Sequence, residues 1–223
     1  RRVPARASRR ADRARRGFNR DAPHERGRAA IERRRETAPI AVFDGVEMDY
    51  HPADEAAIRE FLDGADFDYA IGSVHEVDGH NVHGEAFADR SERERRAAVE
   101  TYVDHLVALV ESELFDVVGH ADVFERNPAL RGHAEPADYE RIADAVAEHR
   151  PLVELNAGRI DREYGRFPPA EPLRAALARE GVGFVPSTDA HSPADLRARV
   201  PSLREAFESV PAAATTPTAT DRP

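Results

Sequence analysis

Residues 182–191, VGFVPSTDAH, form the stretch that decides how the rest of the chain is interpreted. The apolar residues at its start predict a β-strand, and the stretch closes on Asp189 and His191. Because side chains alternate along an extended backbone, two residues at this spacing can face one pocket. A carboxylate oxygen and an imidazole nitrogen form a ligand pair for zinc, manganese or iron. The stretch therefore predicts a metal-binding pocket at the carboxyl end of a strand.

Three apolar stretches upstream end in a residue of a similar kind, namely Glu47, His75 and His120. Taken singly, Glu47 is better explained as a surface acid, and each histidine as a core residue whose hydrogen bonds are satisfied. The recurrence of such residues at successive strand ends predicts instead that all three share a metal site with Asp189 and His191.

Further polar residues extend this pattern. Glu154 and Asn156 have the same two-residue spacing at the end of another apolar stretch. His80 and His83 belong to a polar loop over the predicted pocket, where contact with a substrate and simple exposure to solvent are both open.

Apolar runs and helical patterns alternate along the chain. Strands are predicted at residues 39–50, 67–77, 115–123, 151–158 and 182–191. Helices are predicted at residues 21–36, 53–63, 91–110, 136–149, 171–181 and 192–208. This alternation predicts an α/β fold with parallel strands, in a barrel or a doubly wound sheet. No glycine-rich phosphate loop opens a helix, whereas polar residues recur at the carboxyl ends of the strands, which favours a barrel.

Composition limits the class of protein further. The chain has 223 residues, 41% of them hydrophobic, and no cysteine, so we expect a globular protein without disulfides or thiolate metal sites. No apolar run is long enough for a membrane span, and no signal peptide is recognisable, so a soluble cytoplasmic protein is predicted. Fourteen of the 32 basic residues lie within residues 1–35, and the remainder of the chain is acidic. The acidic remainder argues against nucleic acid as the main partner, because binding phosphate groups needs clustered positive charge.

Three segments are predicted. Residues 1–36 form a basic, atypical segment, which a truncated or misframed start, a disordered tail or a nucleic-acid-binding arm would each explain. Residues 37–209 form the α/β domain, and residues 210–223 form a disordered tail rich in proline, threonine and alanine.

Five short motifs, in this order, resemble the PHP (polymerase and histidinol phosphatase) superfamily: VEMDY, IGSVH, VVGHADV, LNAG and STDAH. They are most similar to the histidinol-phosphatase branch, and the resemblance covers about residues 40–207. It implies a distorted (β/α)7 TIM-like barrel and a cluster of up to three zinc, manganese or iron ions. It also implies hydrolysis of a phosphomonoester, most specifically L-histidinol phosphate in histidine biosynthesis, with nucleotides or other phosphomonoesters as the broader alternative.

The resemblance also assigns residues. It implies that Glu47 bridges two metal ions and that His75, His120, Asp189 and His191 are further metal ligands of the catalytic centre. Either arginine that follows the LNAG motif, Arg159 or Arg162, could pair with the substrate phosphate through two hydrogen bonds.

The chain departs from the family pattern near its start. Family members open with a His-x-His strand, followed by another histidine and an Asp-His pair, but the only histidine before Glu47 is His24. Five strands also close a barrel poorly, so the barrel is expected to be incomplete at the N-terminal side. The one fully represented metal site is Glu47, His75 and His120, and little or no activity is expected of this chain.

Two other functions are weighed against this one. A different metal-dependent barrel hydrolase, such as an amidohydrolase, is disfavoured in its binuclear form because the chain has no lysine to carboxylate. A catalytically inactive barrel that binds a metal ion or a partner is the non-enzymatic alternative.

Overall fold

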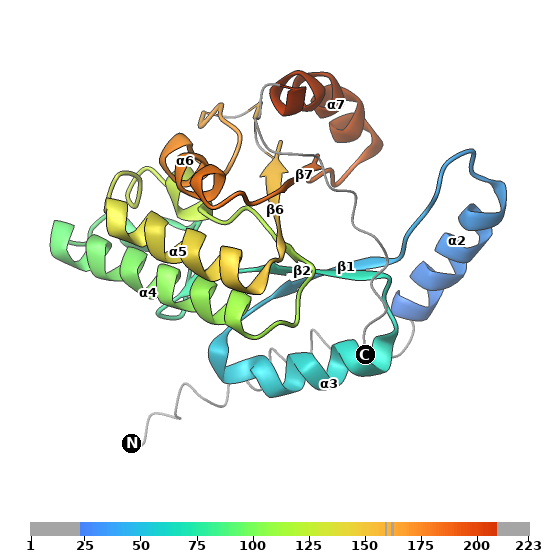
Figure 1. Cartoon of the computed structure of the whole chain (residues 1–223), viewed down its shortest axis with the longest axis horizontal. Coiled ribbons are helices and arrows are strands. Elements are labelled where there is room, and N and C mark those ends of the chain that lie inside the picture. The colour runs from blue at the N-terminus through green and yellow to red at the C-terminus, as the bar shows by residue number, and fades with distance from the viewer. Residues whose placement is uncertain (1–22, 159, 162, 209–223) are drawn as a thin grey trace.

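A five-stranded parallel β-sheet is the centre of the computed structural model, which describes residues 23–158, 160–161 and 163–208 (Figure 1). The strand order is β1-β2-β5-β6-β7. The strands are β1 (Gly45–Asp49), β2 (Tyr69–Ser73), β5 (Val117–Val118), β6 (Leu152–Asn156) and β7 (Phe184–Ser187). Since the spatial order follows the chain order and every pair is parallel, all five carboxyl ends lie at one edge.

This arrangement confirms the predicted α/β fold with parallel strands. Among the described residues the sheet has β1 and β7 at its two edges, so closure into a barrel stays a prediction. The predicted disorder of residues 210–223, and the predicted character of residues 1–22 of the basic segment 1–36, concern parts outside the described residues.

Helices connect the strands. They are α2 (Pro23–Thr37), α3 (Glu55–Ala65), α4 (Glu92–Glu111), α5 (Pro136–His149), α6 (Glu171–Arg179) and α7 (Pro193–Glu208). The short elements are the 3₁₀ turns η1 (Pro52–Asp54), η2 (Glu85–Phe87) and η3 (Val123–Arg126), and the antiparallel strands β3 (Glu76–Val77) and β4 (His80–Asn81). Figure 1 shows α4 and α5 side by side, with α5 also packed against α6. No helix of the described part is long and apolar enough to cross a membrane.

The core lies between the sheet and these helices. Its fully buried side chains include Ala70, Val118, Val153 and Leu155 from the strands and Ile58, Leu106, Ile142, Val146 and Leu173 from the helices. Each fully buried valine, leucine or isoleucine side chain contributes about 1.5–3 kcal/mol through removal of apolar surface from water. Because these residues fill the space beside the strands, the polar residues are left at the strand ends.

The predicted strands are longer than the observed ones. The first begins at Gly45 rather than at residue 39, and Ile40 and Phe43 have 74% and 46% of their surface exposed. Their apolar character indicated a strand, but no neighbouring strand or helix covers them in the described structure. The third is reduced to Val117–Val118, because the chain turns at His120, where φ is +27°.

Helix ends were predicted with mixed success. The start predicted at residue 91 is confirmed, because Ser91 and Glu94 form a capping box: Ser91 N–H donates to Glu94 Oε2 at 2.9 Å and Ser91 Oγ accepts from Glu94 N–H at 3.4 Å. The helix predicted at residues 53–63 ends too early in that prediction. Helix α3 continues to Ala65, which is buried, and the left-handed residue that ends it is Asp66, with φ of +52°.

Candidate metal centre

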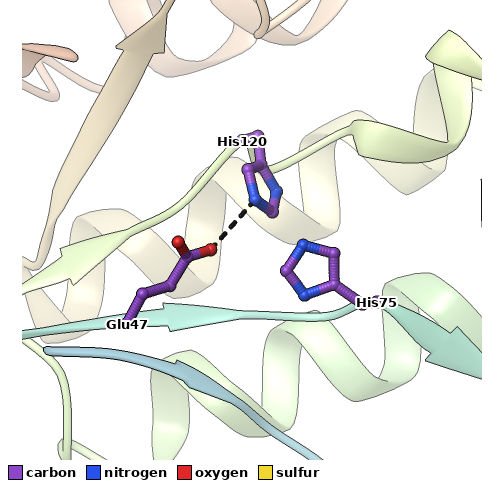
Figure 2. Close-up of side chains that lie close together, drawn as sticks. All are labelled: Glu47, His75 and His120. Carbon is purple, nitrogen blue, oxygen red and sulfur yellow. Dashed lines mark hydrogen bonds and ion pairs between the residues drawn. The ribbon is translucent and has the colours of Figure 1, made fainter. Parts of the chain in front are cut away.

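Glu47, His75 and His120 meet at the carboxyl edge of the sheet (Figure 2). Glu47 lies on β1, His75 follows β2 and His120 follows β5, so three adjacent parallel strands bring together residues far apart in sequence. One ligand atom from each residue lies within 4.8 Å of the others. A carboxylate and two imidazoles at this separation fit a divalent ion such as zinc.

Two hydrogen bonds hold the Glu47 carboxylate. Its Oε1 accepts from Ser73 Oγ at 2.6 Å and lies 3.2 Å from Nε2 of His120. The hydrogen bond with His120 is the main reason that the pKa of Glu47 is lowered to about 2. The hydrogen bond with Ser73 and the charges of both histidines lower this pKa further, whereas burial raises it. The side chain is therefore ionised at neutral pH, as a carboxylate that binds a metal ion must be.

His120 is the most deeply buried of the three. Its backbone N–H donates to Glu154 Oε2 at 3.0 Å, and its backbone φ of +27° is uncommon for a residue other than glycine. The ring Nδ1 is buried and has no hydrogen-bond partner among the described residues. A buried polar atom of this kind is consistent with a site that takes a ligand the protein itself does not supply.

His75 is half-buried, and its ring centroid lies 4.8 Å from that of His120. Asp49 Oδ1 accepts from the backbone N–H of His75 at 3.0 Å and lies 3.5 Å from its ring Nδ1. Burial alone would lower the pKa of His75, but the hydrogen bond and charge of Asp49, with the charges of Glu47 and Asp189, raise it overall.

A buried polar network supports the centre from β6. Glu154 Oε2, which accepts from His120, also accepts from Asn156 Nδ2 at 2.9 Å. Asn156 Oδ1 in turn accepts from Arg126 Nη2 at 2.7 Å and from Gly158 N–H at 2.7 Å. The spacing of Glu154 and Asn156 was evident in the sequence. In the structure the pair accepts hydrogen bonds from the backbone of His120 and from Arg126.

Asp189 and His191 lie on a neighbouring cavity of about 730 Å³, lined also by Arg126, Arg131, Tyr164 and Arg199. Asp189 Oδ2 is 3.9 Å from Arg126 Nη1. The His191 side chain is 83% exposed, with Nδ1 3.7 Å from Asp189 Oδ1. Neither residue belongs to the group within 4.8 Å, so their role as metal ligands stays a prediction.

The residues predicted to bind substrate do not all lie beside the metal centre. The ring of His83 lies 6.2 Å from that of His75, beside the centre, whereas His80 lies 6.2 Å from Phe87. Arg159 and Arg162 are outside the described residues.

Two residues of the site were missed from the sequence. Ser73 precedes His75 by two positions, and the same alternation rule would have found it. No pattern in the sequence points to Arg126, because its hydrogen bond with Asn156 depends on the position that the turn η3 gives it in the folded chain.

Known proteins resemble this chain in sequence and in fold. No family model matches the chain. The chain is 30% identical over 155 residues to the "Probable histidinol-phosphatase" of Deinococcus radiodurans, a match that covers 68% of the chain and 58% of that relative. The chain therefore corresponds to somewhat more than half the length of this curated relative.

A solved structure with a similar fold is that of histidinol phosphate phosphatase (HisK) from Lactococcus lactis, complexed with zinc, L-histidinol and phosphate. Its TM-score is 0.65 at 20% identity, and the alignment covers 85% of this chain and 74% of that one. At this identity the likeness establishes the fold. Sequence and fold together support the histidinol-phosphatase-like assignment that the five motifs predict.

Proposed function

We propose that this chain is a metal-dependent phosphomonoesterase of the histidinol-phosphatase type. The observation that carries the proposal is the convergence of Glu47, His75 and His120 to within 4.8 Å at the carboxyl edge of the sheet. These three residues would hold one divalent ion, for which zinc, manganese and iron are the candidates. Such an ion, when bound, lowers the pKa of water and attracts phosphate oxygens.

Asp189 and His191 are proposed as ligands of a further ion. The chain contains no His-x-His motif, and we propose that its turnover is correspondingly low and that fewer than three ions bind. The zinc complex of the solved neighbour supports zinc as the first metal to test.

The arginines beside this centre support a phosphate-bearing substrate. Arg126 is buried, and Asn156 fixes its orientation through the 2.7 Å bond from Nη2. Arg199 donates from Nη1 to the backbone oxygens of Thr188 at 3.1 Å and Asp189 at 2.6 Å. Because a guanidinium can bind phosphate oxygens in a fixed geometry, we propose Arg126 as a phosphate-binding residue.

Arg159 and Arg162 remain candidates for the same role from the sequence. His80 and His83 remain candidates for contact with the rest of the substrate, and the position of His83 beside His75 favours His83.

The proposed substrate is L-histidinol phosphate, cleaved to L-histidinol and phosphate during histidine biosynthesis in the cytoplasm. The description of the curated relative and the L-histidinol and phosphate of the solved neighbour support this choice. Another phosphomonoester is the broader alternative, and a metal-binding barrel without catalysis is the non-enzymatic one.

The test is release of inorganic phosphate by the purified chain loaded with zinc, manganese or iron, with histidinol phosphate and a nucleoside monophosphate compared at equal concentrations. We expect slow, metal-dependent release that is greater for histidinol phosphate and is lost in Glu47→Gln. Metal binding without any release would favour the non-enzymatic alternative. Equal release from Glu47→Gln would contradict the proposal.

A further inference from the structure

We propose that Asp49 is a positioning residue that sets the orientation and the protonated nitrogen of His75 for metal binding. This inference rests on the proposed metal centre, since His75 is one of its three ligands. Asp49 itself stands outside the group of ligand atoms that lie within 4.8 Å of one another.

The backbone places Asp49 where it can act on His75. Asp49 follows Glu47 by two positions on β1, and it is paired in register with Ser73 of β2. The next residue, Tyr50, donates its backbone N–H to the Ser73 oxygen at 2.7 Å, so the end of β1 is fixed to the end of β2. The carboxylate therefore projects from a rigid strand end.

One oxygen of Asp49 lies close to two nitrogen atoms of His75. Oδ1 accepts from the backbone N–H at 3.0 Å and faces the ring Nδ1 at 3.5 Å. Figure 2 shows that the other ring nitrogen of His75, the one farther from the backbone, points toward His120 and Glu47. Asp49 thus lies on the side of the ring opposite to the metal centre.

A neutral imidazole carries one proton, and a metal ion needs the nitrogen without it. A carboxylate beside Nδ1 favours the proton there and leaves the lone pair of Nε2 directed at the centre. Carboxylate partners of this kind fix the tautomer and ring orientation of metal-binding histidines, and their removal costs 10–100-fold in metal affinity. The 58% exposure of the Asp49 side chain places the expected loss toward the lower end of that range.

The decisive variant is Asp49→Asn. Asparagine keeps a side-chain oxygen for the backbone N–H of His75 and loses the charge that faces the ring. If Asp49 served only to anchor the backbone, this variant would behave as the unaltered chain. Asp104→Asn is the matched control, because Asp104 is 61% exposed and its charge meets Arg141 on α5 rather than a histidine of the centre.

Two measurements test the inference on the full chain. Zinc affinity, from competition with a chelating dye, is expected to fall about 10-fold in Asp49→Asn and to stay unchanged in Asp104→Asn. Independently of metal, the ¹⁵N imidazole signals of His75 at high pH are expected to report a proton on Nδ1, and a shift toward Nε2 protonation in Asp49→Asn.

The outcomes separate this inference from the proposed metal centre. If the unaltered chain binds no zinc, the metal centre fails, and the tautomer measurement still judges the role of Asp49. If the unaltered chain binds zinc while Asp49→Asn keeps its affinity and its His75 tautomer, the metal centre stands and the role of Asp49 is overturned.

Discussion

Ser73 and Glu47 are joined across the β1–β2 pair by a hydrogen bond of 2.6 Å from Ser73 Oγ to Glu47 Oε1. Ser73 is completely buried, and the same Glu47 oxygen faces His120. The serine therefore holds the carboxylate in the direction of the metal centre before any ion arrives. Preorganisation of this kind reduces the cost of ordering a ligand on binding.

Ser73→Ala removes that support. Hydrogen bonds to charged groups contribute about 1.5–3 kcal/mol, so we expect roughly a 10-fold or greater loss of zinc affinity. Ser112→Ala is the control, because the buried Ser112 donates to the Leu109 oxygen at 2.6 Å on α4. Calorimetric titration with zinc should separate the two variants, and equal losses would mean that Ser73 acts only on stability.

Gly158→Ala tests the placement of Asp189. A Cβ at Gly158 would collide with the Asp189 carboxylate and come within 2.7 Å of Asn156 Oδ1. Overpacking at a buried position costs about 1–3 kcal/mol, and relief requires the Asp189 carboxylate to leave its present position. We expect a lower melting temperature and weaker binding of inorganic phosphate. Gly27→Ala, whose added Cβ has no neighbour within 4 Å, should show neither effect.

Asp122 provides a pH-dependent prediction. Its complete burial raises its pKa from 3.8 to about 6, although its Oδ2 accepts from Ala170 N–H at 2.5 Å. The folded chain thus keeps a proton that the unfolded chain releases. The contribution of this group to the free energy of unfolding falls as the pH rises from about 4 to about 6, and is constant above that window.

Asp122→Asn removes this titration and keeps an oxygen for Ala170. We expect the variant to be more stable than the unaltered chain at pH 7, by at most roughly 3 kcal/mol, and the difference to shrink as the pH falls toward 4. Urea unfolding at several pH values measures it. A difference that is independent of pH would show that burial does not perturb this carboxyl.

The sequence could predict the centre because period-two alternation and parallel topology are local rules with a global result. Glu47, His75 and His120 each close an apolar run, and parallel strands bring such ends to one edge. Strand lengths were harder to predict. Ile40 and Phe43 are as apolar as core residues, yet whether a neighbour covers them depends on tertiary contacts.

The supporting residues could not be assigned from sequence for a similar reason. Glu154 and Asn156 were recognised as a pair, but their partners His120 and Arg126 are 34 and 30 residues away. Which polar group meets which across a sheet depends on the register of the strands. The helix end at Asp66 shows the same dependence, because the local pattern alone placed the end of this helix at residue 63.

The most direct test of the metal centre is a zinc titration of the metal-free chain beside two single variants, His120→Ala and His149→Ala. His149 is the control, since it is a histidine that faces Glu113 at 3.1 Å at the end of α5. The metal centre predicts zinc binding by the unaltered chain and by His149→Ala, and its loss or a weakening of at least 10-fold in His120→Ala. Equal zinc binding by all three proteins, or none by any of them, would contradict the centre formed by Glu47, His75 and His120.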